Sequence, residues 1–297
     1  MSITKIEVKN LTAFENMQMS INANVNVIIG ESGTGKTHLL KFIYMLSQLL
    51  TEKAVGFQSF FEAKPQTEEL ILLRDNFKDE ASFSFWIGNE QVQYYCYNRE
   101  KVRLDDNITM EKSKTGIFRS VENSHDKWSE IVKCSLLEHQ LKQLIKNLVF
   151  IPAKDMLAHS KEMPAVKAED GDDIPCDKSL INIINKAATK CKKKEIPVTA
   201  KEIILEFEEM MDKSITEGTI LLWDEPEAHI NPKLIPLLGE VILELGKKGV
   251  QIFLVTYDYL ILKYLEVLRN EEDNLIFHAL YKTDDGVKCE TIERFSP

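Results

Sequence analysis

The fold is decided by the stretch Gly30-Glu-Ser-Gly-Thr-Gly-Lys-Thr37, which fits the pattern G-x-x-x-x-G-K-[ST] without a mismatch. The apolar run at residues 25–29 before it is typical of a buried strand. The stretch at residues 37–50 after it carries leucine and isoleucine at helical spacing. A strand, a glycine loop and a helix N-terminus direct backbone N–H groups at phosphate oxygens. The sequence therefore predicts a phosphate-binding loop.

The residue types in this loop suit a polyphosphate. We expect Lys36 to reach the β- and γ-phosphates and the Thr37 hydroxyl to coordinate Mg²⁺. The backbone N–H of His38 is expected to contact a phosphate, while its side chain has a structural role. The predicted nucleotide-binding residues are those of the loop and the first helical turn: Gly30, Ser32, Gly33, Thr34, Gly35, Lys36, Thr37 and His38.

A second informative stretch is Ile220-Leu-Leu-Trp-Asp-Glu-Pro-Glu227, an apolar run that ends in two adjacent carboxylates. In a parallel sheet, ligands bind outside the carboxyl ends of the strands, so we expect the two acids to face the phosphate loop of a neighbouring strand. Asp224 is predicted to hold the Mg²⁺ shell, and Glu225 to orient and polarise the attacking water. The alternative is a solvated acidic turn before a helix that begins near Pro232, and the phosphate loop argues against it.

Composition narrows the class of protein. The 297 residues are 44% hydrophobic and 28% charged, enough for one large or two modest domains. No stretch resembles a signal peptide or a bilayer span, and five scattered cysteines suggest reduced thiols, so we expect a cytoplasmic protein. A net charge of −10 argues against a protein coated in nucleic acid, although a local basic surface stays open.

The order of the expected elements indicates an α/β fold in three parts. Residues 1–151 form an N-terminal lobe with the phosphate loop and an antiparallel β region. There, residues 82–95 are expected to form a β-hairpin around Gly88-Asn89, and residues 127–147 a helix before a buried strand at 148–151. Residues 152–198 are expected to form an inserted lid or arm.

The C-terminal lobe, residues 199–297, begins with a helix at 199–211 and then alternates strictly between strands and helices. The elements expected after this helix are a strand at 219–223, a helix at 232–247, a strand at 251–255, a helix at 258–269 and two closing strands near 274–281 and 287–293. We expect the acidic pair to end the first of these strands.

Three segments resemble a known family. They are Ile6-Glu-Val-Lys-Asn-Leu-Thr-Ala-Phe14, the loop with Glu31, and Trp223-Asp-Glu-Pro-Glu-Ala-His-Ile-Asn-Pro232. They resemble ABC-class P-loop ATPases of the overcoming-lysogenization-defect and SMC-like type, small prokaryotic ATPases that often serve in anti-phage defence or DNA repair. The resemblance implies a P-loop NTPase fold with an ABC-type head, and ATP and Mg²⁺ as cofactors. It also implies a dimer or higher oligomer through the heads and an effector, a nuclease or toxin, encoded nearby.

The chain departs from this family at three places. The region of the signature motif, residues 198–203, lacks glycine, and no glutamine loop can be assigned. Tyr257 stands where the family has a histidine that senses the γ-phosphate, and a phenol with a pKa of about 10 cannot shuttle protons near neutral pH. Each lost contact to developing charge commonly costs about 10²–10³ in rate, unless lid residues such as Lys154 or Lys161 replace the donors.

The predicted catalytic residues are therefore Lys36, Glu225 and Tyr257, in an ATPase that is slow or assisted by a partner. Its nucleotide state would control its oligomerisation and an effector. The second hypothesis is a scaffold or sensor that binds ATP with negligible turnover. A third, direct DNA processing, is weakened by the acidic charge balance. Phe14 is expected either to stack on adenine or, as is commoner for an aromatic near a core, to pack within the protein.

Overall fold

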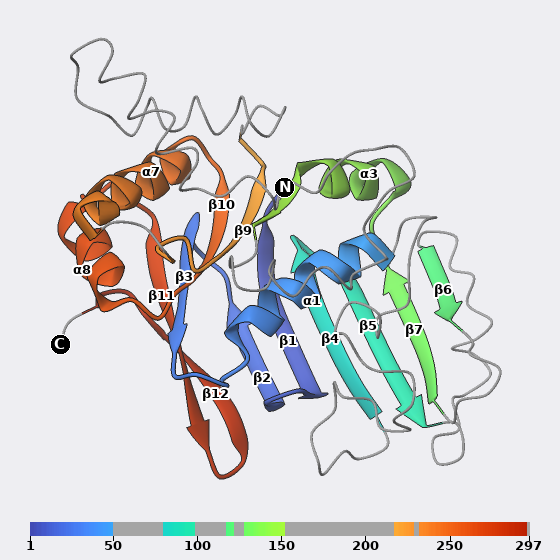
Figure 1. The fold of residues 1–297 in the computed structure, drawn as a ribbon. Coiled ribbons are helices and arrows are strands. Elements are labelled where there is room, and N and C mark those ends of the chain that lie inside the picture. The colour runs from blue at the N-terminus through green and yellow to red at the C-terminus, as the bar shows by residue number, and fades with distance from the viewer. Residues whose placement is uncertain (50–79, 99–116, 122–127, 152–216, 229–231, 296–297) are drawn as a thin grey trace. The chain divides into compact units, whose positions relative to one another are not determined.

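The computed structural model describes residues 1–49, 80–98, 117–121, 128–151, 217–228 and 232–295 (Figure 1). The chain divides into two compact units. Unit 1 comprises Met1–Ile21, Gly30–Leu148 and Leu280–Glu290, and unit 2 comprises Asn22–Ile29, Val149–Ala279 and Thr291–Pro297. The lid expected at 152–198 and the helix expected at 199–211 lie outside the described residues, and the three-part division of the chain stays a prediction.

Unit 1 contains a six-stranded sheet in the order β2-β1-β4-β5-β7-β6. Its strands are β1 (Ile3–Leu11), β2 (Phe14–Ser20), β4 (Glu80–Ile87), β5 (Glu90–Asn98), β6 (Ile117–Val121) and β7 (Trp128–Cys134). Every neighbouring pair runs antiparallel. The sheet confirms the antiparallel region, and β4 and β5 form the expected hairpin, with Gly88 at φ +60° in its turn.

The expectation of a single helix at residues 127–147 is wrong. Its first part is strand β7, and the helix α3 occupies only Glu138–Asn147. Strand β7 pairs with β5 along its whole length, from Trp128 opposite Asn98 to Cys134 opposite Val92. Strand formation in such a short stretch depends on the partner strand and on burial, which local spacing does not reveal.

Helix α1 (Lys36–Leu49) confirms the helix expected after the phosphate loop. Its buried side chains recur at helical spacing: Leu39, Leu40, Ile43 and Leu46 are fully buried. Phe42 of α1 lies against Phe83 of β4, with ring centroids 5.1 Å apart. These contacts hold α1 against the antiparallel sheet. They therefore fix the position of the helix N-terminus, where the phosphate loop ends.

A second six-stranded sheet has the order β12-β11-β3-β10-β9-β8. Its strands are β3 (Val25–Gly30), β8 (Leu148–Ile151), β9 (Ile220–Asp224), β10 (Gln251–Val255), β11 (Leu275–Thr283) and β12 (Gly286–Ile292). Strand β10 pairs in parallel with both β3 and β9. The expectation that the acidic strand directly neighbours the loop strand is therefore corrected, because β10 lies between them. Sequence order does not fix which parallel strands are neighbours, since each is reached through a crossover.

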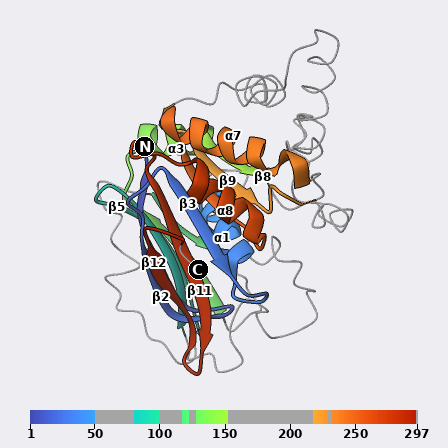
Figure 2. The same ribbon diagram turned by 90° about the vertical axis from the view of Figure 1, so that its left-hand side faces the viewer.

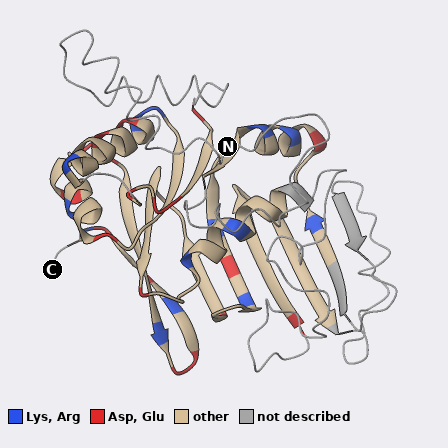
Figure 3. Cartoon of the chain, in the orientation of Figure 1, with Lys and Arg blue, Asp and Glu red and all other residues tan. Residues whose placement is uncertain are grey.

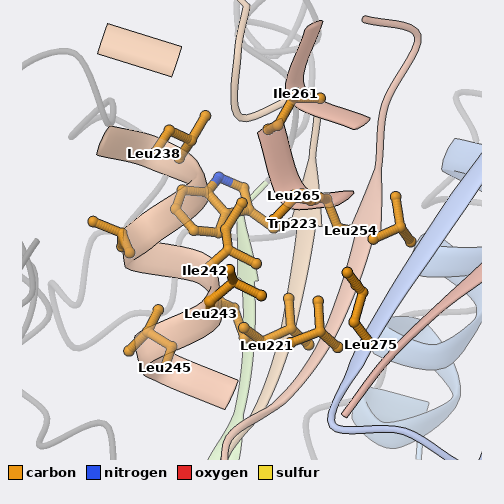
Figure 4. Packing of buried hydrophobic residues seen from close by; sticks show 14 of the residues in the cluster. Leu221, Trp223, Leu238, Ile242, Leu243, Leu245, Leu254, Ile261, Leu265 and Leu275 are labelled. Atoms are coloured by element: carbon orange, nitrogen blue, oxygen red, sulfur yellow. The ribbon is translucent and has the colours of Figure 1, made fainter. Parts of the chain in front are cut away.

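The helices of unit 2 are α7 (Ile235–Lys247), preceded by the 3₁₀ turn η4 (Pro232–Leu234), and α8 (Tyr259–Leu268). Figure 4 shows how they bury the apolar side chains of β9 and β10, with Trp223, Leu254 and Ile242 in one cluster. Full burial of such a side chain contributes about 1.5–3 kcal/mol relative to exposure. Asp258 caps α8 by accepting a hydrogen bond of 2.6 Å from the N–H of Leu260. No described helix is long and apolar enough to cross a membrane.

Strands β11 and β12 form the closing hairpin, which is visible as a long arm in Figure 2 and contributes residues to both units. At its turn, the Thr283 hydroxyl donates a hydrogen bond of 2.7 Å to the carbonyl oxygen of Gly286. The hairpin confirms the two closing strands expected near 274–281 and 287–293. It also carries a lysine to the phosphate loop, as described below.

A polar cluster lies inside unit 2. Asn26 of β3 donates through Nδ2 to the carbonyl oxygens of Ala23 (2.8 Å) and Ile252 (3.3 Å). Its Oδ1, which only accepts, lies 3.3 Å from His278 Nε2, so Nε2 carries the proton and His278 Nδ1 accepts from the Thr291 hydroxyl 3.0 Å away. Burial lowers the pKa of His278 to about 4, so the imidazole is neutral near pH 7.

Candidate nucleotide-binding site

Two glycines of the phosphate loop are required by close contacts as well as by backbone conformation. Gly30 has φ +151°, and a Cβ there would lie 2.3 Å from the carbonyl oxygen of Leu280. Gly35 has φ +86°, and a Cβ there would lie 2.6 Å from the ring of Phe14. Real Cβ atoms do not approach other atoms this closely, so the loop can follow its path only with glycine at both positions.

Phe14 packs within the protein. Its side chain is fully buried and its ring covers Gly35. Of the two alternatives for this residue, the structure favours packing, because a fully buried ring has no free face for adenine. Phe14 instead shapes the loop, by closing the space on one side of Gly35.

Lys36 is buried and holds the loop around its own ammonium group. Nζ donates hydrogen bonds to the carbonyl oxygens of Gly30 (2.6 Å) and Glu31 (2.8 Å). The Thr34 hydroxyl donates to the same Glu31 oxygen at 2.9 Å. These acceptors are neutral carbonyls, and a phosphate oxygen would form stronger, charge-assisted bonds with the same ammonium. The contacts fit a loop whose lysine can pass from carbonyl oxygens to a polyphosphate.

Thr37 and His38 occupy the second and third positions of α1, and both are partly buried. The His38 ring lies 6.1 Å from the ring of Phe42, centroid to centroid. Burial, followed by the nearby charge of Lys41, lowers the pKa of His38 to about 4, so its side chain is neutral. This environment fits the structural role expected for the His38 side chain.

The acidic pair lies where a strand of the parallel sheet ends. Asp224 is the last residue of β9 and is 1% exposed, and Glu225 follows it with its N–H donating to the Val255 carbonyl at 2.9 Å. The register places Asp224 opposite Val255, and Val255 opposite Ile28 of the loop strand. Three parallel strands therefore reach the same level at the edge of the sheet where ligands of α/β proteins bind.

Glu225 has an uncommon backbone conformation, with φ +47°. Residues other than glycine rarely adopt this left-handed region, and those that do cluster at functional sites because the surrounding structure must hold them there. The conformation turns the chain immediately after Asp224. It therefore sets the direction of the side chain that the sequence predicts to activate water.

Tyr257 follows β10 by two residues and is 49% exposed. The residue before it, Thr256, is fully buried and donates a hydrogen bond through its hydroxyl to Glu227 Oε1. The same Thr256 oxygen accepts from the N–H of Asp258 at 2.9 Å. Glu227 is the last residue of the acidic stretch quoted in the sequence analysis, but the sequence pattern predicted no role for it. The bond shows that it joins the turn after β9 to the turn after β10.

Lys282 is the other residue that sequence reasoning missed. It lies on β11, and its Nζ donates a hydrogen bond of 3.0 Å to the carbonyl oxygen of Ser32 in the phosphate loop. A Cβ on Gly33, which has φ +77°, would lie 3.5 Å from the same nitrogen. The two partners are 250 residues apart, so no local pattern could have revealed the contact.

The donor types predicted for the metal suit magnesium. Thr37 and Asp224 offer a hydroxyl and a carboxylate, and Mg²⁺ in nucleotide enzymes prefers oxygen ligands. Magnesium usually keeps several waters and takes one or two protein ligands together with the phosphates. The predicted pair is therefore sufficient in kind for a magnesium–nucleotide complex.

Two family models match the chain. One, described as "AAA ATPase domain", matches residues 1–203, and another, described as "AAA domain, putative AbiEii toxin, Type IV TA system", matches residues 208–263. Among curated proteins, the DNA replication and repair protein RecF of Bacillus mycoides (strain KBAB4) is 47% identical over 47 residues. The match covers 16% of this chain. In the other direction, this chain covers only 12% of the length of that relative.

Solved structures similar to the chain include two SMC heads. An SmcHead bound to the C-winged helix domain of ScpA has a TM-score of 0.49 and 12% identity, over 98% of this chain and 97% of that one. The SMC head domain from Thermotoga maritima has a TM-score of 0.45 and 10% identity, over 99% of this chain and 100% of that one.

Proposed function

The chain belongs to the AAA ATPase domain family, and from this premise we propose that it binds ATP with Mg²⁺ and hydrolyses it slowly or with the help of a partner. The expected α/β fold of a P-loop ATPase, and the resemblance to ABC-class and SMC-like members, are confirmed. In the proposal, Gly30, Ser32, Gly33, Thr34, Gly35, Lys36, Thr37 and His38 bind the nucleotide. Thr37 and Asp224 hold the metal.

The observation that carries the proposal is the loop itself. Lys36 is buried, with its ammonium on the carbonyl oxygens of Gly30 and Glu31, and two of the loop's glycines admit no side chain. An ammonium group on these two carbonyl oxygens, at a loop that leads into a helix N-terminus, is suited to a polyphosphate. The common level of Asp224 and Ile28 across β10 supports a magnesium ion at the same edge of the sheet.

In the proposed reaction, the oxygen of a water molecule attacks the γ-phosphorus, and the bond from that phosphorus to the β–γ bridging oxygen breaks. Glu225 orients and polarises the water and accepts its proton, and Lys36 stabilises the charge that develops on the departing oxygens. Tyr257 donates a hydrogen bond to the γ-phosphate. A tyrosine hydroxyl cannot also take up a proton near neutral pH, which is why we propose slow turnover.

At the level of the cell, we propose that the nucleotide controls assembly of the chain into a dimer or higher oligomer, and with it an effector protein such as a nuclease or toxin. The description of the family model that matches residues 208–263 names a putative toxin of a toxin–antitoxin system, which supports a role in anti-phage defence. The RecF relatives, named for DNA replication and repair, support a role in DNA maintenance instead.

A second candidate function is a scaffold or sensor that retains ATP without turnover. It is favoured by Tyr257, which stands half-exposed where the resembled family has a histidine. Both candidates require ATP binding at the loop. They differ in whether phosphate is released.

The test combines nucleotide binding with steady-state phosphate release. We expect Lys36→Ala to lose ATP binding, and Glu225→Gln to bind ATP like the parent but release no phosphate. Glu240→Gln, an exposed change on α7, serves as the control for charge. Phosphate release is measured for the chain alone and with the product of the neighbouring gene. Parent-like binding and turnover in both variants would overturn the proposal, whereas ATP binding without turnover under either condition would favour the scaffold.

A further inference from the structure

We propose that Lys282 supplies a second ammonium group to the polyphosphate bound at the loop. The inference rests on the proposed function, because it needs a nucleotide at residues 30–37. Its starting observation is the 3.0 Å hydrogen bond from Lys282 Nζ to the carbonyl oxygen of Ser32. This bond brings a cation from the end of the chain to the middle of the loop.

The backbone of the hairpin is fixed where Lys282 departs from it. The carbonyl oxygen of Leu280, two residues earlier on β11, lies only 2.3 Å from where a Cβ of Gly30 would stand. The other strand is attached as well, because the N–H of Val287 donates to the carbonyl oxygen of Ala13 at 3.2 Å. Lys282 therefore projects from a hairpin that contacts the loop through β11 and the turn between β1 and β2 through β12, so its reach depends mainly on its side chain.

The Lys282 ammonium also lies above the part of the loop that glycine leaves open. The nearest atom to a Cβ placed on Gly33 is Lys282 Nζ, at 3.5 Å. Gly33 stands between Ser32 and Thr34, in the segment whose N–H groups we expect to bind phosphate oxygens. A phosphate oxygen at this point would lie within reach of the same ammonium.

Electrostatics favours a change in the hydrogen-bond partner of the Lys282 ammonium, from a carbonyl oxygen to a phosphate oxygen. Lys282 now binds a neutral carbonyl oxygen at an exposed position, and a phosphate oxygen would replace it with a charge-assisted bond of roughly twice the strength. Asp284 and Asp285 follow this lysine at the hairpin turn, and Glu31 precedes Ser32 in the loop. Figure 3 shows the basic and acidic segments of the hairpin in blue and red.

The experiment measures the dissociation constants of Mg·ATP and Mg·ADP by fluorescence titration with labelled nucleotides at several salt concentrations. Lys282→Met keeps most of the side-chain stem and removes the charge, and Lys282→Arg keeps the charge. The matched control is Lys288→Met on the other strand of the hairpin, since Lys288 forms no hydrogen bond or ion pair with the described residues. Lys36→Ala reports on the loop itself, and thermal unfolding reports on folding.

We expect Lys282→Met to weaken ATP binding by about ten- to a hundred-fold, the loss typical of a hydrogen bond to a charged group. Its ATP affinity should also depend less on salt than that of the parent, because one screened charge contact is gone. Lys282→Arg should retain most of the affinity and Lys288→Met all of it. A purely structural lysine would lower thermal stability and leave the salt dependence unchanged.

Parent-like ATP affinity and salt dependence in Lys282→Met, together with loss of binding in Lys36→Ala, would overturn this inference and leave the proposed function intact. Lys282 would then only brace the hairpin. Parent-like binding in Lys36→Ala would instead overturn the proposed function. If Lys282→Met lowers thermal stability, Lys282→Arg decides the matter, because restored affinity with restored salt dependence supports the phosphate contact.

Discussion

Thr256 and Glu227 join the ends of two parallel strands through one hydrogen bond. The Thr256 hydroxyl donates to Glu227 Oε1, while its oxygen accepts from the N–H of Asp258. Thr256 follows β10 directly, and Glu227 stands three residues after the end of β9. The turn with Glu225 is thereby tied to the turn with Tyr257, the two residues that the proposed reaction places near the γ-phosphate.

This relationship predicts a specific loss of stability in Thr256→Val. Valine keeps the shape but removes the hydroxyl that donates to Glu227 and accepts from the Asp258 N–H, which should cost about 1–3 kcal/mol. Thr256→Ser retains the hydroxyl and should stay within about 1 kcal/mol of the parent. Urea unfolding of the three proteins measures the difference. Equal stability of the valine and serine variants would show that the bond contributes nothing.

Glu227 predicts an unusual pH dependence. Burial raises the pKa of this carboxyl group, against the opposing effect of the Thr256 hydrogen bond. The folded protein therefore holds the proton more tightly than the unfolded chain. This contribution to stability is fully present below the unfolded pKa of about 4.5 and is lost as the pH rises through the raised pKa.

Glu227→Gln removes the titrating group, so its stability relative to the parent should increase as the pH is raised above about 4.5. The measurement is the free energy of unfolding in urea at a series of pH values between 4 and 8. Glu240→Gln, exposed on α7, is the control for the removal of a carboxyl group. A constant difference between Glu227→Gln and the parent would contradict the raised pKa.

We predict that the backbone conformation of Glu225 lowers the stability of the fold, although its side chain is needed for hydrolysis. Its φ of +47° lies in the left-handed region, which costs of order 1 kcal/mol or more for most residues and less for asparagine. Glu225→Asn should therefore be as stable as Glu225→Gln or more stable, by up to about 1 kcal/mol, and neither variant should release phosphate. Thermal unfolding and phosphate release are measured on the same preparations. An asparagine variant clearly less stable than the glutamine variant would show that the backbone at this position carries no strain.

The sequence correctly predicted the structural features that depend on residues close together along the chain. The contacts of Lys36 with Gly30 and Glu31 span only five or six residues, so an eight-residue pattern was enough to identify the loop. Strand β10 was equally readable, because its buried residues 252–255 form one continuous apolar run, and in helix α7 the buried residues recur at helical spacing. In these elements, local spacing and burial coincide.

The features that the sequence did not predict depend on contacts between residues far apart along the chain. Trp128–Cys134 became a strand because β5 offered a free edge, although its spacing also suited a helix. The position of β10 between β3 and β9 follows from how the crossovers pack, which no motif encodes. Lys282 contacts a loop 250 residues away, so nothing in the sequence around it distinguishes it from the other lysines.

His278 gives a prediction for acid stability. Its ring is fully buried and neutral, with Nε2 donating to Asn26 and Nδ1 accepting from Thr291. Burial lowers its pKa from 6.5 to about 4, so between these values the unfolded chain binds a proton that the folded protein does not. Stability should fall as the pH is lowered from about 6.5 to about 4, by up to roughly 3 kcal/mol from this residue. The partly buried His38, also with a pKa of about 4, adds to the fall.

The check is His278→Leu, measured by urea unfolding from pH 4 to pH 8. At pH 7 leucine should cost about 1–3 kcal/mol, since Asn26 Oδ1 and the Thr291 hydroxyl lose their partner. Leucine cannot be protonated, so the variant should lose less stability than the parent between pH 6.5 and 4, and the two curves should converge toward acid. His139→Gln, exposed on α3, controls for the removal of a histidine. Parallel curves for His278→Leu and the parent would mean that His278 titrates alike in the folded and unfolded chains, and that burial of the ring carries no electrostatic cost.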